Sequence, residues 1–178
     1  MTITLIDIAA ALWFIFPAYC ANGAPVIFGG GQPMDFGKNF VDGKPLFGSH
    51  KTWRGFFAGI IIGTFVGFVQ TILYEQILFQ YSPQFNYSIL LGFMISVGAV
   101  TGDLIESCIK RRINRNPGSD LPIADQLDFV LGAFLFSIPI SPPPLVYVIL
   151  ILLITIPTHY LTNFGAALLN MKNKRKNK

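Results

Sequence analysis

Five apolar stretches run along the chain, separated by polar or turn-forming segments. They cover residues 3–21, 53–73, 87 to about 109, 123–138 and 144 to about 169. A helix needs roughly 20 residues to cross about 30 Å of hydrocarbon. No Lys or Arg precedes the first stretch and no convincing small-residue cleavage site follows it, so we expect it to remain as a helix rather than be removed as a signal peptide. The pattern predicts an all-α polytopic membrane protein with five transmembrane helices.

Composition supports a membrane as the main solvent. Of the 178 residues, 52% are hydrophobic and 12% are charged, and the mean hydropathy is +0.55. Soluble domains usually carry about 25% charged residues. These values exclude a disordered chain, a coiled coil and an ordinary nucleic-acid module, and the length favours a single domain over residues 1–178. The two cysteines, Cys20 and Cys108, fit neither a disulfide framework nor a zinc site.

The positive charges predict which way the chain crosses the membrane. All 13 Lys and Arg residues fall in segments that five spans would place on one side: the loop at about 23–52 and its flank, the loop at 110–122, and the basic tail at 171–178. The opposite connections, 75–86 and 139–143, contain no Lys or Arg. The positive-inside rule then predicts an amino terminus outside, a carboxy terminus in the cytoplasm, and a multi-pass protein of the cell membrane.

The second apolar stretch carries a glycine at every fourth position: Gly55, Gly59, Gly63 and Gly67. This spacing clears one helical face for close backbone contact. Such a face favours tight packing inside one bundle, and the alternative is a homodimer through the same face. The sequence does not separate the two.

A glycine-containing loop precedes this second stretch and ends in DGKPLFGSHKTWRG. Its backbone N–H groups and the following helix start favour phosphate binding, although the GxxxxGK[ST] spacing of a Walker loop is absent. The alternative is a solvated face that contacts lipid headgroups. The candidate substrate-binding residues here are Asp42, Lys44, His50, Lys51, Thr52 and Arg54.

The third stretch ends in GDLIESCIKRR, which places Asp103, Glu106, Ser107 and Lys110 on one helical face. A purely structural interpretation is a Glu106–Lys110 ion pair at a charged helix end. Asp103 lies about one turn deeper than the basic cluster and needs a partner at that depth.

The fourth stretch opens with PIADQLDF, which places Asp125 and Asp128 one turn apart. Asp125 is explained by stabilisation of the helix dipole, but Asp128 is deeper and is followed at once by apolar residues. Carboxylate oxygens are the ligands that Mg²⁺ prefers when it is shared with substrate phosphates. Acids on two adjacent helix ends, ringed by Lys and Arg at the membrane surface, predict a metal-nucleotide or metal-diphosphate site with a lipid substrate.

These motifs resemble the carboxy-terminal signature of the membrane cytidylyltransferases, the CDP-diacylglycerol synthase superfamily. Three further segments, PAYCANGAPV, DGKPLFGSHKTWRG and PTHYLTNFGAAL, are similar to the archaeal branch, whose members make CDP-archaeol. The likeness runs over most of the chain. The bacterial enzymes are usually longer and carry a glycine- and histidine-bearing segment beside the second acid pair, which this sequence lacks.

The resemblance implies that CTP and 2,3-bis-O-(geranylgeranyl)-sn-glycerol 1-phosphate yield a CDP-archaeol-type lipid and pyrophosphate, with Mg²⁺ required. We expect Asp103, Asp125 and Asp128 to hold Mg²⁺. The groups expected to stabilise the phosphates are Lys44, Lys51, Lys110 and Arg111. The expected catalytic residues are Lys51, Ser107, Lys110 and Arg111, with Ser107 as a hydrogen-bonding positioner. The remaining expected substrate-binding residues are Asn22, Glu106, Arg112, His159 and Asn163. Taken alone, Asn22 resembles a helix cap and His159 a packing residue.

Three other functions remain open on the sequence. One is a CDP-diacylglycerol synthase that acts on phosphatidic acid. A CDP-alcohol phosphotransferase also uses membrane acids and Mg²⁺, but its longer DGxxAR-type run is absent. The third is a non-enzymatic scaffold or lipid-binding protein whose charges only contact anionic headgroups.

Overall fold

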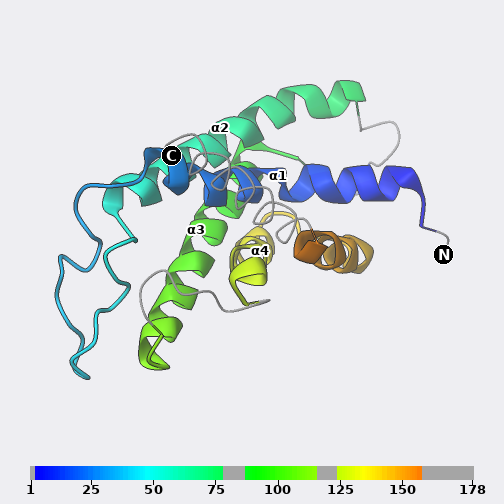
Figure 1. The fold of residues 1–178 in the computed structure, drawn as a ribbon. Helices are drawn as coiled ribbons and strands as arrows, with labels where there is room; N and C mark the ends of the chain where they lie inside the picture. Colours follow the sequence, from blue (N-terminus) through cyan, green and yellow to red (C-terminus); the bar gives the residue numbers. More distant parts are fainter. Residues whose placement is uncertain (1–2, 78–86, 116–123, 158–178) are drawn as a thin grey trace, which may run out of the picture.

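The computed structural model describes residues 3–77, 87–115 and 124–157 of the chain, and within these ranges every regular element is a helix (Figure 1). The labelled helices are α1 (Leu5–Phe28), α2 (Trp53–Ile77), α3 (Ile89–Arg112) and α4 (Ala124–Ser137), and a further helix spans Leu145–Pro157. Helices α1 and α2 run side by side and α3 crosses them, with α4 packed against α3. The predicted all-α architecture is confirmed for the described residues.

Three of the helices are long and apolar enough to cross a membrane: α1, α2 over Trp53–Tyr74, and α3. Helix α4 has 14 residues, or about 21 Å at 1.5 Å per residue, which is shorter than the hydrocarbon layer. Helix Leu145–Pro157 is also apolar but short, and the rest of the predicted fifth span lies outside the described residues. The chain is therefore a helical membrane protein, whereas five spans and the orientation of the termini stay predictions.

The first helix is longer than the sequence predicts. It begins at Thr4, whose hydroxyl and Asp7 form a reciprocal capping box. It passes through Asn22 and ends at Gly29, whose N–H donates to the Pro25 carbonyl at 2.8 Å. The predicted end of this span at residue 21, and the interpretation of Asn22 as a helix cap, are therefore wrong. The loop that follows covers residues 29–52 rather than 23–52.

Two prolines inside α1 explain how it packs against α2. A proline has no N–H, so the carbonyl four residues earlier loses its helical hydrogen bond. Pro17 frees the carbonyl of Trp13, which accepts a hydrogen bond from Gln70 Nε2 at 2.9 Å. Pro25 frees the carbonyl of Ala21, and α2 approaches that oxygen closely through a glycine.

The glycine repeat of α2 is used for packing inside the chain. A Cβ atom at Gly59 would lie 2.7 Å from the Ala21 carbonyl oxygen, and one at Gly63 would lie 2.3 Å from Ser96 Oγ. A Cβ at Gly67 would lie 2.6 Å from the Cα of Gly92. This face therefore lets α2 approach both α1 and α3, as the packing interpretation predicts. A homodimer through the same face stays an untested prediction.

A second set of glycines joins α3 to α4. A Cβ at Gly98 would lie 2.4 Å from the Gly132 carbonyl oxygen, and one at Gly102 would lie 2.2 Å from the Asp128 carbonyl oxygen. The two backbones therefore touch beside Asp103 and Asp128. This contact fixes the relative position of the two acidic helix ends.

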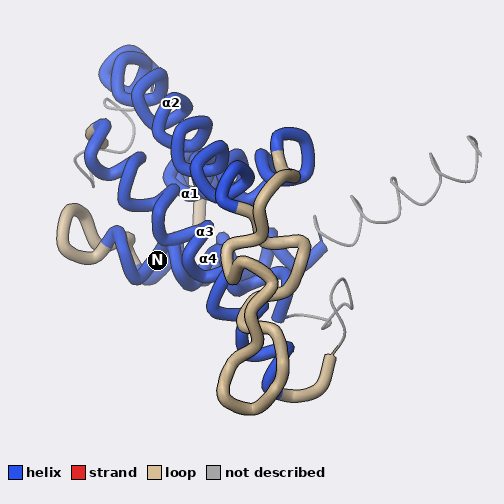
Figure 2. Tube along the Cα trace, turned by 90° about the vertical axis from the view of Figure 1, so that its left-hand side faces the viewer, coloured by secondary structure: helices blue, strands red, loops and turns tan. Residues whose placement is uncertain are grey.

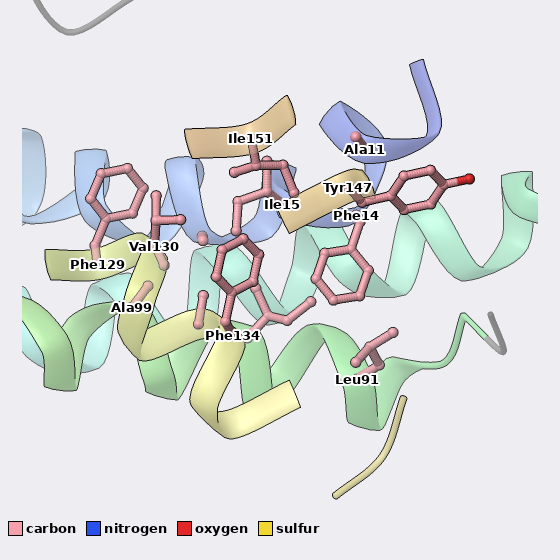
Figure 3. Close-up of a cluster of buried hydrophobic side chains, with 14 of the residues drawn as sticks. Ala11, Phe14, Ile15, Leu91, Ala99, Phe129, Val130, Phe134, Tyr147 and Ile151 are labelled. Carbon is pink, nitrogen blue, oxygen red and sulfur yellow. The ribbon is translucent and has the colours of Figure 1, made fainter. Parts of the chain in front are cut away.

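The core lies where α1, α3, α4 and helix Leu145–Pro157 converge (Figure 3). Phe14 and Ile15 from α1 are fully buried there, as are Phe129 of α4 and Tyr147 of the following helix. Large exposed hydrophobic side chains cover the outer faces, as expected for helices that contact lipid. The core thus packs against α3 and α4, and the polar end of α3 contacts the loop at 29–52.

Candidate active site

The end of α3 gathers most of the candidate residues, and its local structure explains why it stops there. The backbone N–H of Arg115 donates to the Lys110 carbonyl at 2.9 Å, and that of Asn114 donates to the Arg111 carbonyl at 3.4 Å. Asn114 has a φ of 63°, in the left-handed region that asparagine tolerates better than most residues. This pattern is a Schellman motif. It ends the helix immediately after the basic run Lys110–Arg112.

Lys51 and Asp103 form the first ion pair of the site. Lys51 Nζ lies 2.6 and 2.7 Å from the two carboxylate oxygens of Asp103, and it bridges the loop at 29–52 to α3. The pair borders a cavity of about 40 Å³ that His50 and Thr52 also line. Ligand pockets commonly measure about 300–1,000 Å³. The Lys51–Asp103 pair therefore closes a space too small for a nucleotide.

Lys110 forms the second ionic group and links α3 to α4. Its Nζ lies 2.9 Å from Glu106 Oε1 and 2.6 Å from Asp125 Oδ1. The Glu106–Lys110 ion pair of the structural interpretation is confirmed, but it also extends to a second helix. Lys110 and Glu106 are 8% exposed, so these charges are largely withdrawn from water.

Asp128 lies one helical turn beyond Asp125. Its Oδ1 accepts a hydrogen bond from the Phe129 N–H at 2.6 Å. The charges of Asp103, Glu106 and Lys51 are close enough to interact with its carboxylate. Two carboxylates close together repel unless a cation lies near them. In the described part of the chain, no three Asp, Glu, His or Cys side chains are grouped as a metal centre. Asp103, Asp125 and Asp128 thus share one region, with lysines bound to the first two.

The loop at 29–52 is organised around Asp35, which the sequence analysis did not single out. Its carboxylate accepts hydrogen bonds from the N–H groups of Gly37, Phe47 and Gly48 at 3.0, 3.2 and 2.9 Å. Burial alone would raise the pKa of Asp35, but these backbone hydrogen bonds together hold it below its ordinary value. Gly48 has a φ of 97°, which a side chain would strain. In the sequence, the signal for this role of Asp35 is an acid close to glycines in a loop.

Arg112, Asp42 and Lys44 join the loop to the end of α3. Arg112 Nη1 lies 3.1 Å from Asp42 Oδ1, and Nη2 donates to the Pro45 carbonyl. Lys44 Nζ returns a hydrogen bond to the Arg112 carbonyl at 3.2 Å. The three residues were predicted to bind substrate, and in this structure they bind one another.

The other predicted residues are placed as follows. Ser107 and Arg111 are buried in α3. Thr52 is buried, and its hydroxyl accepts a hydrogen bond from the Gly55 N–H at 3.2 Å, which caps the start of α2. Asn22 is half-buried inside α1, and Arg54 is exposed. His159 and Asn163 lie outside the described residues.

The arrangement is an alternation of cations and carboxylates on three segments: the loop at 29–52, α3 and α4. Charges withdrawn in part from water, as these are, are stable only when each has a partner. An anion that enters would compete with the carboxylates for the lysines, and a cation would compete with the lysines for the carboxylates. The site is therefore suited to an anion that arrives together with a cation.

Comparison with known proteins gives consistent matches over nearly the whole chain. A family model described as CarS-like, CDP-archaeol synthase, matches residues 2–175. The CDP-archaeol synthase of Methanocaldococcus jannaschii is 45% identical over 168 residues, which cover 92% of this chain and 94% of that protein. That of Pyrococcus furiosus is 42% identical over 166 residues, which cover 93% and 96%.

A solved structure is also similar. It is described as an intramembrane enzyme for archaeal membrane lipids biosynthesis, and it matches with a TM-score of 0.75 and 32% identity. The match covers 88% of this chain and 94% of that chain.

Proposed function

The chain belongs to the CDP-archaeol synthase family, and from this premise we propose that it transfers the cytidylyl group of CTP to the phosphate of 2,3-bis-O-(geranylgeranyl)-sn-glycerol 1-phosphate. The products are a CDP-archaeol-type lipid and pyrophosphate. The chain is thus a cytidylyltransferase of archaeal lipid synthesis. The observation in the structure that supports this function best is the ionic cluster of Lys51, Asp103, Lys110 and Asp125, which joins the loop, α3 and α4.

The reaction needs stabilisation of the negative charge on two phosphates rather than a nucleophilic side chain. A phosphate oxygen of the lipid attacks the α-phosphorus of CTP, and the bond to the bridging oxygen of the β-phosphate breaks as pyrophosphate leaves with the electron pair. The nucleophile is already anionic at neutral pH. The main barrier is repulsion between two anions, which fixed cations and correct alignment lower.

Lys51 and Lys110 are the cations best placed for this task. The Nζ atom of each lies 2.6 Å from a carboxylate oxygen, Lys51 from that of Asp103 and Lys110 from that of Asp125. When the triphosphate binds, we expect both ammonium groups to turn from the carboxylates to phosphate oxygens. Arg111, which is buried and follows Lys110 in α3, would stabilise the leaving pyrophosphate.

We propose Mg²⁺ as the cofactor, held by Asp103, Asp125 and Asp128. The donor chemistry fits, because carboxylate oxygens are the ligands that Mg²⁺ prefers and because Asp128 and Asp103 are close enough to interact. The three carboxylates are not gathered as a metal centre in the described residues, so they would have to move closer together to share the ion. When bound, the ion would neutralise triphosphate charge and support in-line displacement. The three carboxylates would hold the ion at the junction of α3 and α4.

We also propose that the site faces the cytoplasm and that the chain spans the membrane five times. The support is the distribution of all 13 basic residues in segments of one side. Two variants test this in a background in which Cys20 and Cys108 are replaced by serine: Ser49→Cys in the loop at 29–52, and Pro142→Cys in the connection after α4, both at exposed positions. In intact cells, a membrane-impermeant maleimide should label the second variant only. Labelling of Ser49→Cys would contradict the orientation.

The experiment that tests the function uses purified protein in detergent with Mg²⁺ and each of the four nucleoside triphosphates in parallel. The isoprenoid ether-lipid phosphate or phosphatidic acid serves as acceptor, and pyrophosphate release is followed. We expect release with CTP and the ether-lipid phosphate. A preference for phosphatidic acid would indicate a diacylglycerol enzyme, and the absence of release with every pair would contradict the proposal.

A further inference from the structure

The loop at 29–52 consists of two connected parts, and Figure 2 shows it as the long tan segment between α1 and α2. The inner part is closed by the hydrogen bonds of Asp35 and by pairing of the Met34 N–H with the Lys51 carbonyl at 2.8 Å. The outer part is a short hairpin, in which the Phe40 N–H donates to the Lys44 carbonyl at 2.7 Å. The inner part carries Lys51, which pairs with Asp103, whereas the outer part carries Asp42 and Lys44, which contact Arg112.

Arg112 holds the outer hairpin against α3. Its guanidinium lies 3.1 Å from Asp42 Oδ1, donates to the carbonyl of Pro45, and stacks on the Phe40 ring at 5.0 Å from the ring centre. Lys44 Nζ completes the contact on the Arg112 carbonyl at 3.2 Å. The planar guanidinium suits this combination of carboxylate, carbonyl and aromatic partners, which a lysine could not satisfy.

We propose that Arg112 is a positioning residue that docks the outer hairpin and thereby holds Lys51 opposite Asp103. Helix α3 fixes the same loop at two points, Arg112 and Asp103, nine residues or about 13.5 Å apart along the helix. Without the Arg112 side chain, the loop is held on α3 by the Lys44 hydrogen bond to the Arg112 carbonyl and by the Lys51–Asp103 pair, which CTP must open. Docking by Arg112 keeps Lys51 near the site while its side chain changes partners. This inference rests on the proposed function, since it assigns Lys51 to the triphosphate.

A direct role in substrate binding predicts a different outcome, because Arg112 is engaged by an acid. If Arg112 bound the triphosphate, loss of Asp42 would release it and remove a negative charge, so CTP would bind more tightly. If Arg112 docks the loop, loss of Asp42 removes one of the contacts that dock the hairpin, so CTP binds more weakly. The sign of the Asp42→Ala effect therefore separates the two roles.

The experiment measures CTP binding and the KM for CTP in Arg112→Ala, Asp42→Ala and the double variant. The matched control is Lys38→Ala, which removes one cation from an exposed position of the same loop, where the ammonium forms no hydrogen bond or ion pair with the described residues. We expect each single variant to weaken CTP about tenfold, the loss typical of one hydrogen bond to a charged group. The double variant should be no worse than Arg112→Ala, because both changes break one contact. At saturating CTP, kcat should stay close to normal, since a reduced docked fraction raises the apparent dissociation constant.

Hydrogen exchange of the free protein supplies a readout that is independent of catalysis. The Phe40 and Gly43 amides, which donate to the Lys44 and Phe40 carbonyls within the hairpin, should exchange faster in Arg112→Ala and Asp42→Ala and not in Lys38→Ala. Tighter CTP binding in Asp42→Ala, additive losses in the double variant, or unchanged exchange would overturn the docking role. If exchange and CTP binding change as expected while no variant or wild type forms a CDP-lipid, the proposed reaction fails and the docking role stands.

Discussion

The Lys51–Asp103 pair leads to a prediction about metal-free nucleotide binding. Both carboxylate oxygens lie within 2.7 Å of Lys51 Nζ, and the two side chains are 26% and 24% exposed. A hydrogen bond to a charged group contributes about 1.5–3 kcal/mol, and solvent screening lowers this at a partly exposed site. We take about 1.4 kcal/mol, which corresponds to about tenfold in affinity. CTP must overcome this pairing before it can use Lys51.

Asp103→Asn releases Lys51, so we expect it to bind CTP about tenfold more tightly than wild type when EDTA removes divalent cations. With Mg²⁺ present the order should reverse, because the variant lacks a carboxylate for the ion. Isothermal titration calorimetry of the protein in detergent measures both affinities. Relative to wild type, Asp103→Asn should thus bind CTP more tightly in EDTA and more weakly in Mg²⁺.

Asp128→Asn is the matched control, because it removes the same charge and no lysine forms an ion pair with Asp128 among the described residues. It should gain less affinity in EDTA than Asp103→Asn. Adding Lys51→Ala to Asp103→Asn should abolish the gain. Equal affinities of Asp103→Asn and wild type in EDTA would refute the idea that Asp103 withholds Lys51 from the nucleotide.

Two further predictions concern the supports of the site. Gly102→Ala places a Cβ atom 2.2 Å from the Asp128 carbonyl oxygen and should separate α3 from α4, which lowers the thermal midpoint and the activity together. At Gly23 a Cβ atom meets no other atom within 4 Å, so Gly23→Ala should leave the midpoint and the activity nearly unchanged. Equal midpoints for the two variants would contradict this packing. Asp35 has a lowered pKa in the folded protein, so its contribution to stability is present above its unfolded pKa and is lost as pH falls through the folded pKa. The Gly48 amide should therefore lose protection from hydrogen exchange at low pH in wild type and at every pH in Asp35→Ala, and protection that persists in Asp35→Ala would contradict that role.

The helices were predictable where apolar runs have clear ends. The predicted ranges 53–73, 87–109 and 123–138 correspond to α2, α3 and α4 with shifts of a few residues. The end of α1 was not predictable from Asn22 and Gly23, which are typical of a helix terminus. The helix continues through these residues, and α2 packs closely on the carbonyl that Pro25 leaves free.

The candidate site was predictable to a similar extent. Residues close in sequence, such as Glu106 and Lys110, pair as helical spacing dictates. The docking of Arg112 on Asp42 joins residues 70 positions apart, and a local pattern carries no information about such a contact. The Gly98 and Gly102 spacing was visible in the sequence, and its function became evident only when α4 was placed against it.

The most direct test of the central claim follows the phosphates of CTP in a single reaction with Mg²⁺ and the isoprenoid ether-lipid phosphate. With label at the α-phosphate, radioactivity should enter the lipid in equal amount to the pyrophosphate released, and label at the γ-phosphate should appear only in pyrophosphate. Asp128→Asn should abolish both signals while the protein remains folded. Lipid labelled from the γ-phosphate, or normal transfer by Asp128→Asn, would contradict a cytidylyl-transfer site built from the ends of α3 and α4.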